Sequence, residues 1–431
     1  MPAVNRLIGG TARCNVPARI LPLPLIPGGG DPCRKITRSR EARLSPIAAG
    51  EWQMSRIGRR ALIVILPFLL HLASGMTVRA APIELTVMTQ NLYVGADTRP
   101  LLEAPDLPIA EIRVAEAFQD VVANDFPARA AAIASRIQAA GGPLLIGLQE
   151  ASIISGGGVT LDYAQILQSQ LAALGLDYTI AGVHEGSSVA LAGFSVTDRD
   201  IVLARTGVPG FTVTGSESRT FANNSVFPTV LGPISADRGY VLVDAMLDSV
   251  PFQFVSTHLE SFIEPVRLLQ AQELLTALST GTTPQLLVGD FNANPAQQTY
   301  QQIVAAGFVD TAAAVGVVGP TCCQDRDLSN PASGLTSRFD YIFARDFPSI
   351  LSAFLVSDTP FQMVRPLWPS DHAGVVATVA VPEVSSAAIL AVSMLLVSPF
   401  VGFGVRRRYR VPSAAGQPLS RTIRPIRSSV T

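Results

Sequence analysis

Apolar runs of strand length recur along this chain and end at carboxylate, amide or imidazole side chains, and this pattern constrains the fold more than any other feature. The runs are rich in Val, Ile, Leu and Phe and lie at residues 83–90, 144–149, 200–204, 239–247, 252–257, 285–288, 338–343 and 374–379. Helical periodicity is clearest between them, at residues 111–139, 164–174 and 266–278. This alternation predicts a single α/β domain over residues 82–380, with helices on the outer faces of its sheets.

Turn and loop signals divide these elements. Residues 239–257 predict a β-hairpin that turns at residues 248–251. The glycine run at residues 156–158 and the segment 215–233 are interpreted as surface loops, and His184 is expected on a loop.

Polar residues stand at or beside the ends of many of these strands. They are Asn91, Glu150, His258, Asp290, Asn292, Asp340, Asp371 and His372. For any one of them, a turn or capping role is the simpler interpretation. Because ligands of α/β sheets bind at the carboxyl ends of strands, the recurrence predicts that these side chains converge on one cleft.

An apolar segment at residues 61–76 follows Met54 and a cluster of arginines, and small residues follow it. This is the order of a secretory signal peptide, which we place at residues 54–81; a buried helix is the alternative. Residues 1–53 are Pro, Gly and Arg rich without a hydrophobic period. They are expected to be a disordered extension, or to precede the true start of the protein at Met54.

A second apolar segment, residues 387–405, is long enough to span a bilayer, and an arginine cluster at residues 406–410 follows it. The preceding Pro-Glu-Val at residues 382–384 resembles the PEP-CTERM sorting signal of Gram-negative bacteria, although the second proline is missing and residues 411–431 continue as a disordered tail. Residues 381–410 are thus expected to be a membrane anchor, with a buried core helix as the alternative. The resemblance implies a processing protease as a partner.

These two ends predict an exported protein. The expected location is the periplasm, the cell surface or the medium, with the C-terminal helix holding the chain in the inner membrane before any processing. The sequence predicts no oligomeric state.

The expected domain is strongly acidic. Residues 82–380 hold 29 Asp and Glu against 13 Arg and no Lys, although the whole chain has a formal net charge of −1. Such a surface lacks the basic footprint that supplies most non-specific affinity for nucleic acid. Bound divalent cations would offset part of this charge locally, so the charge does not exclude a nucleic acid substrate.

Cysteine is scarce in the expected domain. It holds only the adjacent Cys322 and Cys323, which could form a vicinal disulfide, pair between chains or stay reduced. No CxxC or Cys/His cluster in the sequence supports a four-ligand zinc site.

The short motifs QN, QE, STHLE, GDFN, FDYIF and SDH occur in this order along the chain. Their order resembles that of the endonuclease/exonuclease/phosphatase superfamily, which includes deoxyribonuclease I, AP endonucleases, neutral sphingomyelinases and inositol polyphosphate 5-phosphatases. The resemblance covers residues 85–379. It implies a four-layer α/β sandwich, in which two mixed sheets pack face to face between helices. It also implies a divalent cation, usually Mg²⁺ with Mn²⁺ or Ca²⁺ as alternatives, and hydrolysis of a phosphodiester or phosphomonoester.

The resemblance also suggests a role for each polar residue. Glu150 is expected to be the first metal ligand, because a hard cation prefers carboxylate oxygen. Asn91 would assist at the metal or the phosphate, and Asp371 would bind the metal or support its ligands. His372 would contact the scissile phosphate or take a proton, and Asp340 would fix its tautomer.

The remaining candidates act on the water, the phosphate and the leaving group. Asp290 would orient or deprotonate the attacking water, and Asn292 would donate to a phosphate oxygen. His258 would hydrogen-bond the phosphate or aid departure of the leaving group. Arg238 and Tyr93 are weaker candidates for substrate binding, since a structural ion pair and core packing explain them as well.

Three functions follow from these predictions. The first is an exported Mg²⁺-dependent phosphodiesterase that acts on nucleic acid. The second is a sphingomyelinase-like or phospholipase C-like enzyme that acts on phospholipid head groups, or a phosphatase of small phosphoesters, which the acidic surface and the membrane anchor favour. The third is a non-catalytic surface binding module with the same fold.

Overall fold

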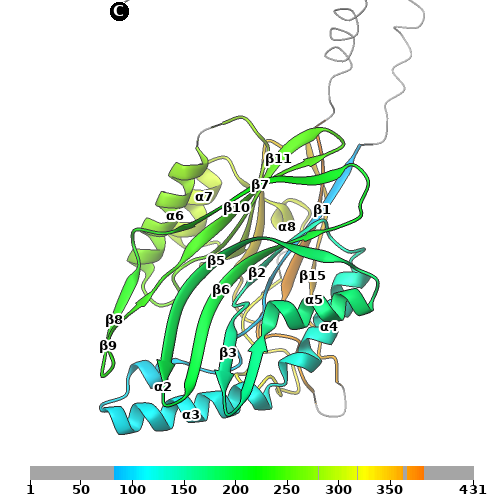
Figure 1. Cartoon of the computed structure of the whole chain (residues 1–431). Helices are drawn as coiled ribbons and strands as arrows, with labels where there is room; N and C mark the ends of the chain where they lie inside the picture. Colours follow the sequence, from blue (N-terminus) through cyan, green and yellow to red (C-terminus); the bar gives the residue numbers. More distant parts are fainter. Residues whose placement is uncertain (1–81, 280, 318, 363–365, 383–431) are drawn as a thin grey trace, which may run out of the picture. The chain divides into compact units, whose positions relative to one another are not determined.

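A computed structural model describes residues 82–279, 281–317, 319–362 and 366–382, and all of them belong to one compact unit. The larger of two mixed sheets has the strand order β15-β16-β1-β2-β6-β3-β4, and β5 pairs with β6 (Figure 1). Its strands are β1 (Glu84–Asn91), β2 (Leu145–Gln149), β3 (Ile153–Gly156), β4 (Val159–Asp162), β5 (Tyr178–Leu191), β6 (Phe194–Arg205), β15 (Ser349–Val356) and β16 (Gly374–Ala380). We call it the first sheet.

The second sheet has the order β13-β14-β12-β11-β10-β7. Its strands are β7 (Phe211–Thr220), β10 (Gly239–Leu247), β11 (Val250–His258), β12 (Gln285–Asp290), β13 (Val309–Asp310) and β14 (Asp340–Arg345). A separate hairpin joins β8 (Ser225–Thr229) to β9 (Gly232–Ala236). Each sheet contains one parallel pair, β1 with β2 and β11 with β12, which brings the carboxyl ends of those strands to one edge.

The helices in the described ranges are α2 (Arg99–Leu102), α3 (Leu107–Ala123), α4 (Phe126–Ala139), α5 (Tyr163–Ala173), α6 (Glu264–Leu278), α7 (Gln298–Ala305) and α8 (Thr311–Ala314). The helical pattern at residues 111–139 is divided between α3 and α4. Asp125 causes the break, because it has a φ of 42° and its carboxylate accepts a hydrogen bond from the Ala128 amide as the N-cap of α4.

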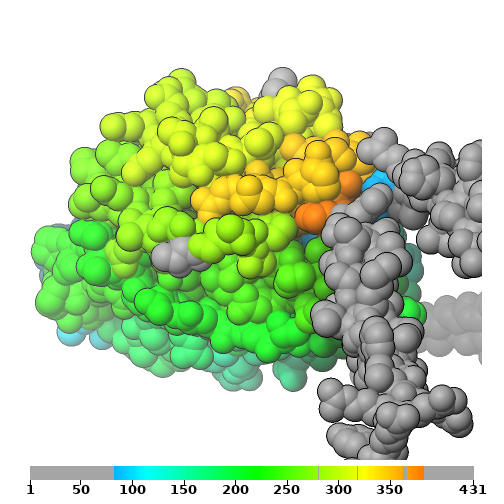
Figure 2. All heavy atoms as spheres, turned by 90° about the horizontal axis from the view of Figure 1, so that it is seen from above, coloured from blue at the N-terminus to red at the C-terminus, as the bar shows by residue number. Residues whose placement is uncertain are grey.

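Alternation along the strands builds three cores. On β1, Leu85 and Val87 face the second sheet, whereas Met88 packs toward α4 and α5. On β12, Leu286 and Val288 join the core between the sheets, and Leu287 packs toward α6 and α7. Three cores require four layers, and the view from above shows teal atoms along one side of the molecule and yellow-green atoms along the opposite side (Figure 2). The predicted four-layer fold is confirmed.

The sheets approach each other closely near the ends of β2 and β11. A Cβ at Gly147 would lie 2.6 Å from Ser256 Oγ and 2.8 Å from Val288 Cγ2. Gln149 donates a hydrogen bond across the same gap to Ser256 Oγ at 3.0 Å. Glycine at this position therefore lets the two sheets meet beside the ends of these strands.

Two local predictions are wrong. The segment 215–233 contains most of β7, β8 and the start of β9, and His184 lies on β5, buried at 2% exposure, instead of on a loop. Both errors come from the polar, Gly- and Ser-rich composition of these strands, which hides the alternation expected of β-structure. The hairpin at residues 239–257 forms as predicted, with Asp248 and Ser249 at positive φ in its turn.

The predicted signal peptide, the Pro-Glu motif beyond Pro382 and the C-terminal apolar segment lie outside the described residues. Among the helices that the structure describes, none has the length and apolar character needed to cross a membrane.

Candidate active site

The polar residues at the strand ends meet at one edge of the two sheets. Asn91 ends β1, and Glu150 follows β2, which runs parallel to it. On the second sheet, His258 and Asp290 end the parallel strands β11 and β12 and are paired in register. Both sheets therefore present polar side chains at the edge where their parallel strands end.

Asp340 and His372 reach this edge from the opposite chain direction. Asp340 starts β14, which is antiparallel to β12, and pairs with Asp290. His372 precedes β16, which is antiparallel to β1. The expectation that these residues stand at strand exits is thus wrong, but antiparallel pairing brings them to the same site.

The GDFN segment has a tightly constrained backbone. Gly289 has a φ of 144°, and a Cβ there would lie 1.9 Å from the carbonyl oxygen of Thr257. Asn292 has a φ of 50°; its backbone amide donates to Asp290 Oδ1 at 2.9 Å, and its side-chain amide donates to the Leu259 carbonyl at 3.0 Å. This turn holds the Asp290 carboxylate in one orientation and leaves one amide hydrogen of Asn292 for another acceptor.

Asn91 connects the two halves of the site. Its side-chain amide donates to Glu150 Oε1 at 3.1 Å and to Asp290 Oδ2 at 3.2 Å. The backbone amide of Val94 donates to the other oxygen of Glu150 at 2.7 Å. One neutral amide therefore bridges a carboxylate of the first sheet and a carboxylate of the second.

The two histidines of the site have opposite electrostatic surroundings. His372 Nδ1 lies 2.8 Å from Asp340 Oδ2, and Nε2 lies 3.7 Å from Asp290 Oδ2. Burial lowers the pKa of His372, but Asp340, Asp290 and Asp371 outweigh that effect and hold the pKa well above its usual range. His372 is therefore an imidazolium near neutral pH, with Nδ1–H donating to Asp340.

His258 is neutral. Burial, the Arg238 guanidinium and the charge of His372 lower its pKa well below the usual value. Arg238 donates to His258 Nδ1 at 2.8 Å, so the imidazole proton sits on Nε2, which lies 3.6 Å from Asp290 Oδ2. The structure thus gives His258 an N–H that points toward the carboxylate of Asp290.

The site holds four carboxylates, of which Asp290 and Asp340 are buried and Glu150 and Asp371 are half-buried. Ligand atoms of Asp290, Asp340 and His372 lie within 4.8 Å of one another, close enough to hold one metal ion. Burial and the charges of Asp371 and Asp198 raise the pKa of Glu150 to about 7. Burial raises the pKa of Asp290 to about 7 and that of Asp371 as well. Buried Oδ1 of Asp340 has no hydrogen-bond partner. Mutually repelling carboxylates with a free oxygen are the donor set that a hard cation takes.

Comparison with known proteins identifies the family. Residues 88–372 match the family model described as endonuclease/exonuclease/phosphatase family. The chain belongs to this family. Its members are metal-dependent hydrolases of phosphoester bonds, and this chain is an enzyme of that class. A comparison with curated protein sequences gives no match.

Several solved structures resemble this protein. A family protein from Bacteroides thetaiotaomicron is 20% identical, with a TM-score of 0.48, 70% of this chain and 100% of that chain covered. A mannosyl-6-phosphatase of the same species is 19% identical, with a TM-score of 0.46 and coverage of 69% and 99%. D. rerio TDP2 complexed with single strand DNA product is 16% identical, with a TM-score of 0.42 and coverage of 69% and 98%.

Sequence reasoning missed three polar residues that support the site of this phosphoesterase. Asp198 on β6 accepts from Arg238 at 3.2 Å, and Asp200 lies 3.9 Å from His258 Nδ1. The guanidinium of buried Arg129 donates to the backbone carbonyls of Leu92, Tyr93, Asn124 and Pro369. Asp198 and Asp200 lie inside β6, although the sequence predicted a strand only from residue 200 onward, where Asp200 stands at the amino end. Arg129 lies on α4, so neither it nor Asp198 carried a positional signal.

The two weaker substrate-binding candidates differ in their surroundings. Arg238 lies inside the site, between Asp198 and His258. Tyr93 is buried, its hydroxyl donates to the Arg326 carbonyl at 2.9 Å, and its ring packs with Leu328 and Trp368. The structure thus gives Tyr93 a packing role, whereas Arg238 contacts a catalytic candidate.

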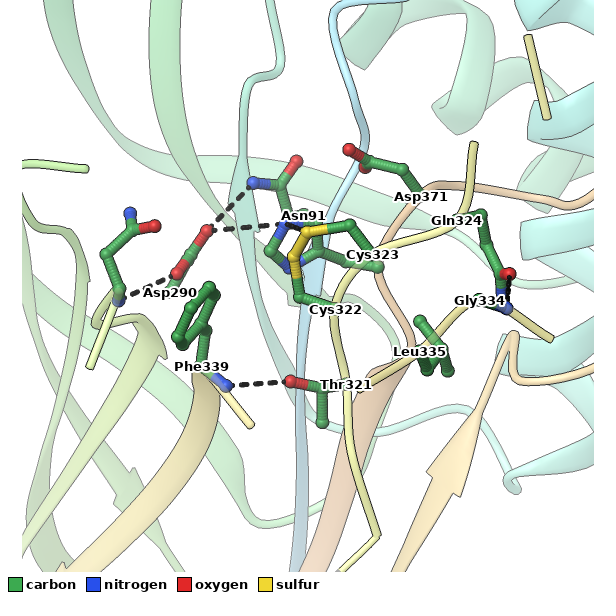
Figure 3. The surroundings of a disulfide bond; sticks show 12 residues. Asn91, Asp290, Thr321, Cys322, Cys323, Gln324, Gly334, Leu335, Phe339 and Asp371 are labelled. Atoms are coloured by element: carbon green, nitrogen blue, oxygen red, sulfur yellow. Dashed lines mark hydrogen bonds and ion pairs between the residues drawn. A yellow bond between two sulfur atoms is a disulfide. The ribbon is translucent and has the colours of Figure 1, made fainter. Parts of the chain in front are cut away.

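A vicinal disulfide joins Cys322 to Cys323 beside this site (Figure 3). Cys323 is exposed, and its Sγ lies 3.9 Å from His372 Nε2. Backbone hydrogen bonds tie the segment to the SDH motif, because Ala373 donates to the Thr321 carbonyl and Gln324 to the Asp371 carbonyl. The disulfide therefore borders the imidazole that faces Asp290.

Proposed function

We propose that this protein is an exported, Mg²⁺-dependent phosphodiesterase that uses water to hydrolyse a P–O bond. The observation that supports it best is the His372–Asp340 pair beside Asp290, at 2.8 Å and 3.7 Å, within a cluster of buried carboxylates. A cationic ring next to a carboxylate with a pKa of about 7 is suited to acid–base work near neutral pH.

Glu150 and Asp371 would hold the cation, with Asn91 orienting Glu150. A bound Mg²⁺ supplies charge neutralisation to the phosphoryl oxygens, so that an anionic diester can accept a nucleophile. The raised pKa values of both carboxyls support this assignment, because burial and then neighbouring carboxylates disfavour their charged forms, and a bound cation would offset both effects.

The chain's own residues would carry the proton steps. Asp290 accepts a proton from the attacking water, since its Oδ1 is fixed by the Asn292 amide and its Oδ2 faces both imidazoles. His372, protonated and held by Asp340, donates its Nε2–H to a phosphoryl oxygen. The neutral His258 hydrogen-bonds the phosphate or the leaving oxygen through its Nε2–H and keeps that proton, while the leaving oxygen takes its proton from solvent water. The remaining amide hydrogen of Asn292 binds a phosphoryl oxygen.

Export is part of the proposal. The signal at residues 54–81, the catalytic region 82–380, the Pro-Glu motif with an apolar span at 381–410 and the tail 411–431 support a protein delivered across the inner membrane and held there. A sorting protease would release it if the PEP-CTERM-like segment functions. Fractionation of cells before and after deletion of residues 381–431 tests this part, because the proposal predicts that deletion moves the protein from the membrane to the soluble fraction.

The chemical proposal is tested with purified protein on plasmid DNA, RNA, sphingomyelin and bis-p-nitrophenyl phosphate. We expect cleavage with Mg²⁺, none with a chelator, and none from His372→Ala. A wild-type protein that cleaves none of the four with Mg²⁺ rules the phosphodiesterase out. From the sequence, nucleic acid is the first expected substrate; cleavage of sphingomyelin alone would reverse that order.

A further inference from the structure

A pocket of about 200 Å³ opens beside Glu150 and runs away from the catalytic groups. One end is polar and is lined by Glu150, Asp198 and Arg238. The walls beyond that end are largely apolar and come from α2, β6, the β8–β9 hairpin and the loop after β11; they include Leu101, Leu102, Val196, Phe227, Ile234 and Phe262. A substrate whose phosphate meets the catalytic groups would place one substituent along these walls.

The apolar surface continues beyond this pocket. Leu102, Phe227 and Phe262 also line a second hollow of about 380 Å³, and the rings of Phe227 and Phe262 pack edge to face with centroids 6.2 Å apart. In Figure 1 the β8–β9 hairpin extends toward α2, so that the two elements flank the same region. A cavity of about 150 Å³ lined by apolar side chains already holds benzene, so the space is sufficient for a ring or an alkyl chain.

Charge argues against a long polyanion in this region. The guanidinium of Arg238 is paired with Asp198, and that of Arg99, at the second hollow, is paired with Asp97 at 2.8 Å. Glu150 and Asp198 add negative charge to the polar end. Thr98 and three serines also line the pocket, but the hydroxyls of Ser152, Ser187 and Ser235 already donate to Asp198, the Ser235 carbonyl and Asp237. A nucleobase beside Leu101, Val196 and Ile234 would leave hydrogen-bonding edges unpaired, and unpaired polar groups in apolar surroundings are costly.

We propose that this pocket binds an apolar substituent of the substrate, so that the preferred substrate is a phosphodiester carrying an alkyl chain or a hydrophobic ring. This inference rests on the proposed phosphodiesterase activity and specifies its substrate class. It places the apolar group between α2 and the β8–β9 hairpin, while the phosphate lies at the catalytic groups His258, Asn292 and His372, beyond the polar end of the pocket.

The test uses the full chain with Mg²⁺ and p-nitrophenyl esters of methyl, butyl and octyl phosphate, each below its micelle concentration. Burial of each methylene favours binding by about 2- to 4-fold, so we expect kcat/KM for the octyl ester to exceed that for the methyl ester by about 100-fold or more. The p-nitrophenyl ester of thymidine 5′-phosphate is the comparison with a nucleoside.

A matched pair of variants locates the effect. Phe227 lines the pocket, whereas the neighbouring Val226 on β8 does not and is 58% exposed. Phe227→Ser should lower the octyl-to-methyl ratio of kcat/KM about tenfold, and Val226→Ser should leave that ratio at the wild-type value. The ratio is insensitive to a loss of folded protein, because both esters are measured on the same preparation.

The outcomes separate this inference from the proposed function. Equal rates on the methyl and octyl esters, or a preference for the thymidine ester, would overturn the apolar assignment while leaving the phosphodiesterase intact. An equal fall of the ratio in both variants would overturn the placement in this pocket. Hydrolysis of none of the esters with Mg²⁺ would remove the proposed function and the inference together.

Discussion

Replacement of Glu150 by Gln tests the electrostatics of the site directly. The Glu150 carboxyl has a pKa of about 7, against an ordinary value near 4.5, because burial and neighbouring carboxylates disfavour its charged form. The folded state therefore holds a proton that the unfolded state releases, and the free energy of unfolding falls as pH rises from about 4.5 to 7. Each pKa unit corresponds to about 1.4 kcal/mol, so this group accounts for a loss of about 3 kcal/mol across that window.

The assay is thermal unfolding in chelator at pH 5 and pH 8. The unfolding entropy is about 2.1 cal/mol/K per residue, so one kcal/mol shifts the Tm of a domain of about 300 residues by about 1.6 °C. Between pH 5 and pH 8 the wild-type Tm should therefore fall by about 4 °C through Glu150 alone. Glu150→Gln removes that contribution and should lose correspondingly less stability between the two pH values. Glu111→Gln, an exposed substitution on α3, is the control and should follow the wild type.

Addition of Mg²⁺ at pH 8 completes the experiment. A cation present at 100 times its Kd stabilises the folded state by about 2.7 kcal/mol, and the wild type and Glu111→Gln should gain Tm accordingly. Glu150→Gln should gain little. An equal Mg²⁺-induced gain in Tm for all three proteins would refute Glu150 as a metal ligand. A Glu150→Gln protein whose Tm depends on pH as the wild type does would refute the destabilisation assigned to ionised Glu150.

Three further predictions concern the groups around this carboxyl. Asp340→Asn, which removes the charge that keeps His372 protonated, should lower kcat by about 10²- to 10⁴-fold; a kcat near the wild-type value would contradict the pairing. Arg238→Met should raise the pKa of His258, because the guanidinium charge lowers it, and an NMR titration of the His258 ring that stays unchanged would contradict this coupling. Gly289→Ala should destabilise the protein to urea by at least about 3 kcal/mol, since its Cβ would lie 1.9 Å from the Thr257 carbonyl, whereas Gly193→Ala, which meets no neighbour within 4 Å, should cost about 1 kcal/mol.

The sequence predicts the layers well where strands are buried. Runs such as residues 285–288 and 374–379 are apolar on both faces, because β12 and β16 pack against a core on each side. It fails for β5 and β7, where polar and small residues cover a partly exposed face and composition resembles that of a loop. Local composition cannot distinguish such a strand from a loop, since its pairing with β6 or β10 is a long-range contact.

The residues of the site also differ in how well the sequence predicts them. Asp290 and His372 stand in short motifs that mark them, whereas Arg129 acts through backbone carbonyls from a helix and carries no motif. The pairing of Arg238 with His258 depends on the register of β10 against β11, which no spacing along the chain encodes. Candidates that stand in short motifs, including Asp340 beside His372, are thus readable from sequence, whereas Arg129, Asp198 and Asp200 are not.

Because the site is divided between two sheets, the protein should be active only after the two sheets have packed together. Asn91 and Glu150 belong to the first sheet, Asp290 and His258 to the second, and the Asn91 amide joins them only when the sheets dock. During refolding, each sheet can regain its backbone circular dichroism signal before the reaction centre exists. Recovery of phosphodiester hydrolysis therefore should lag behind that signal and report the moment at which the two sheets meet.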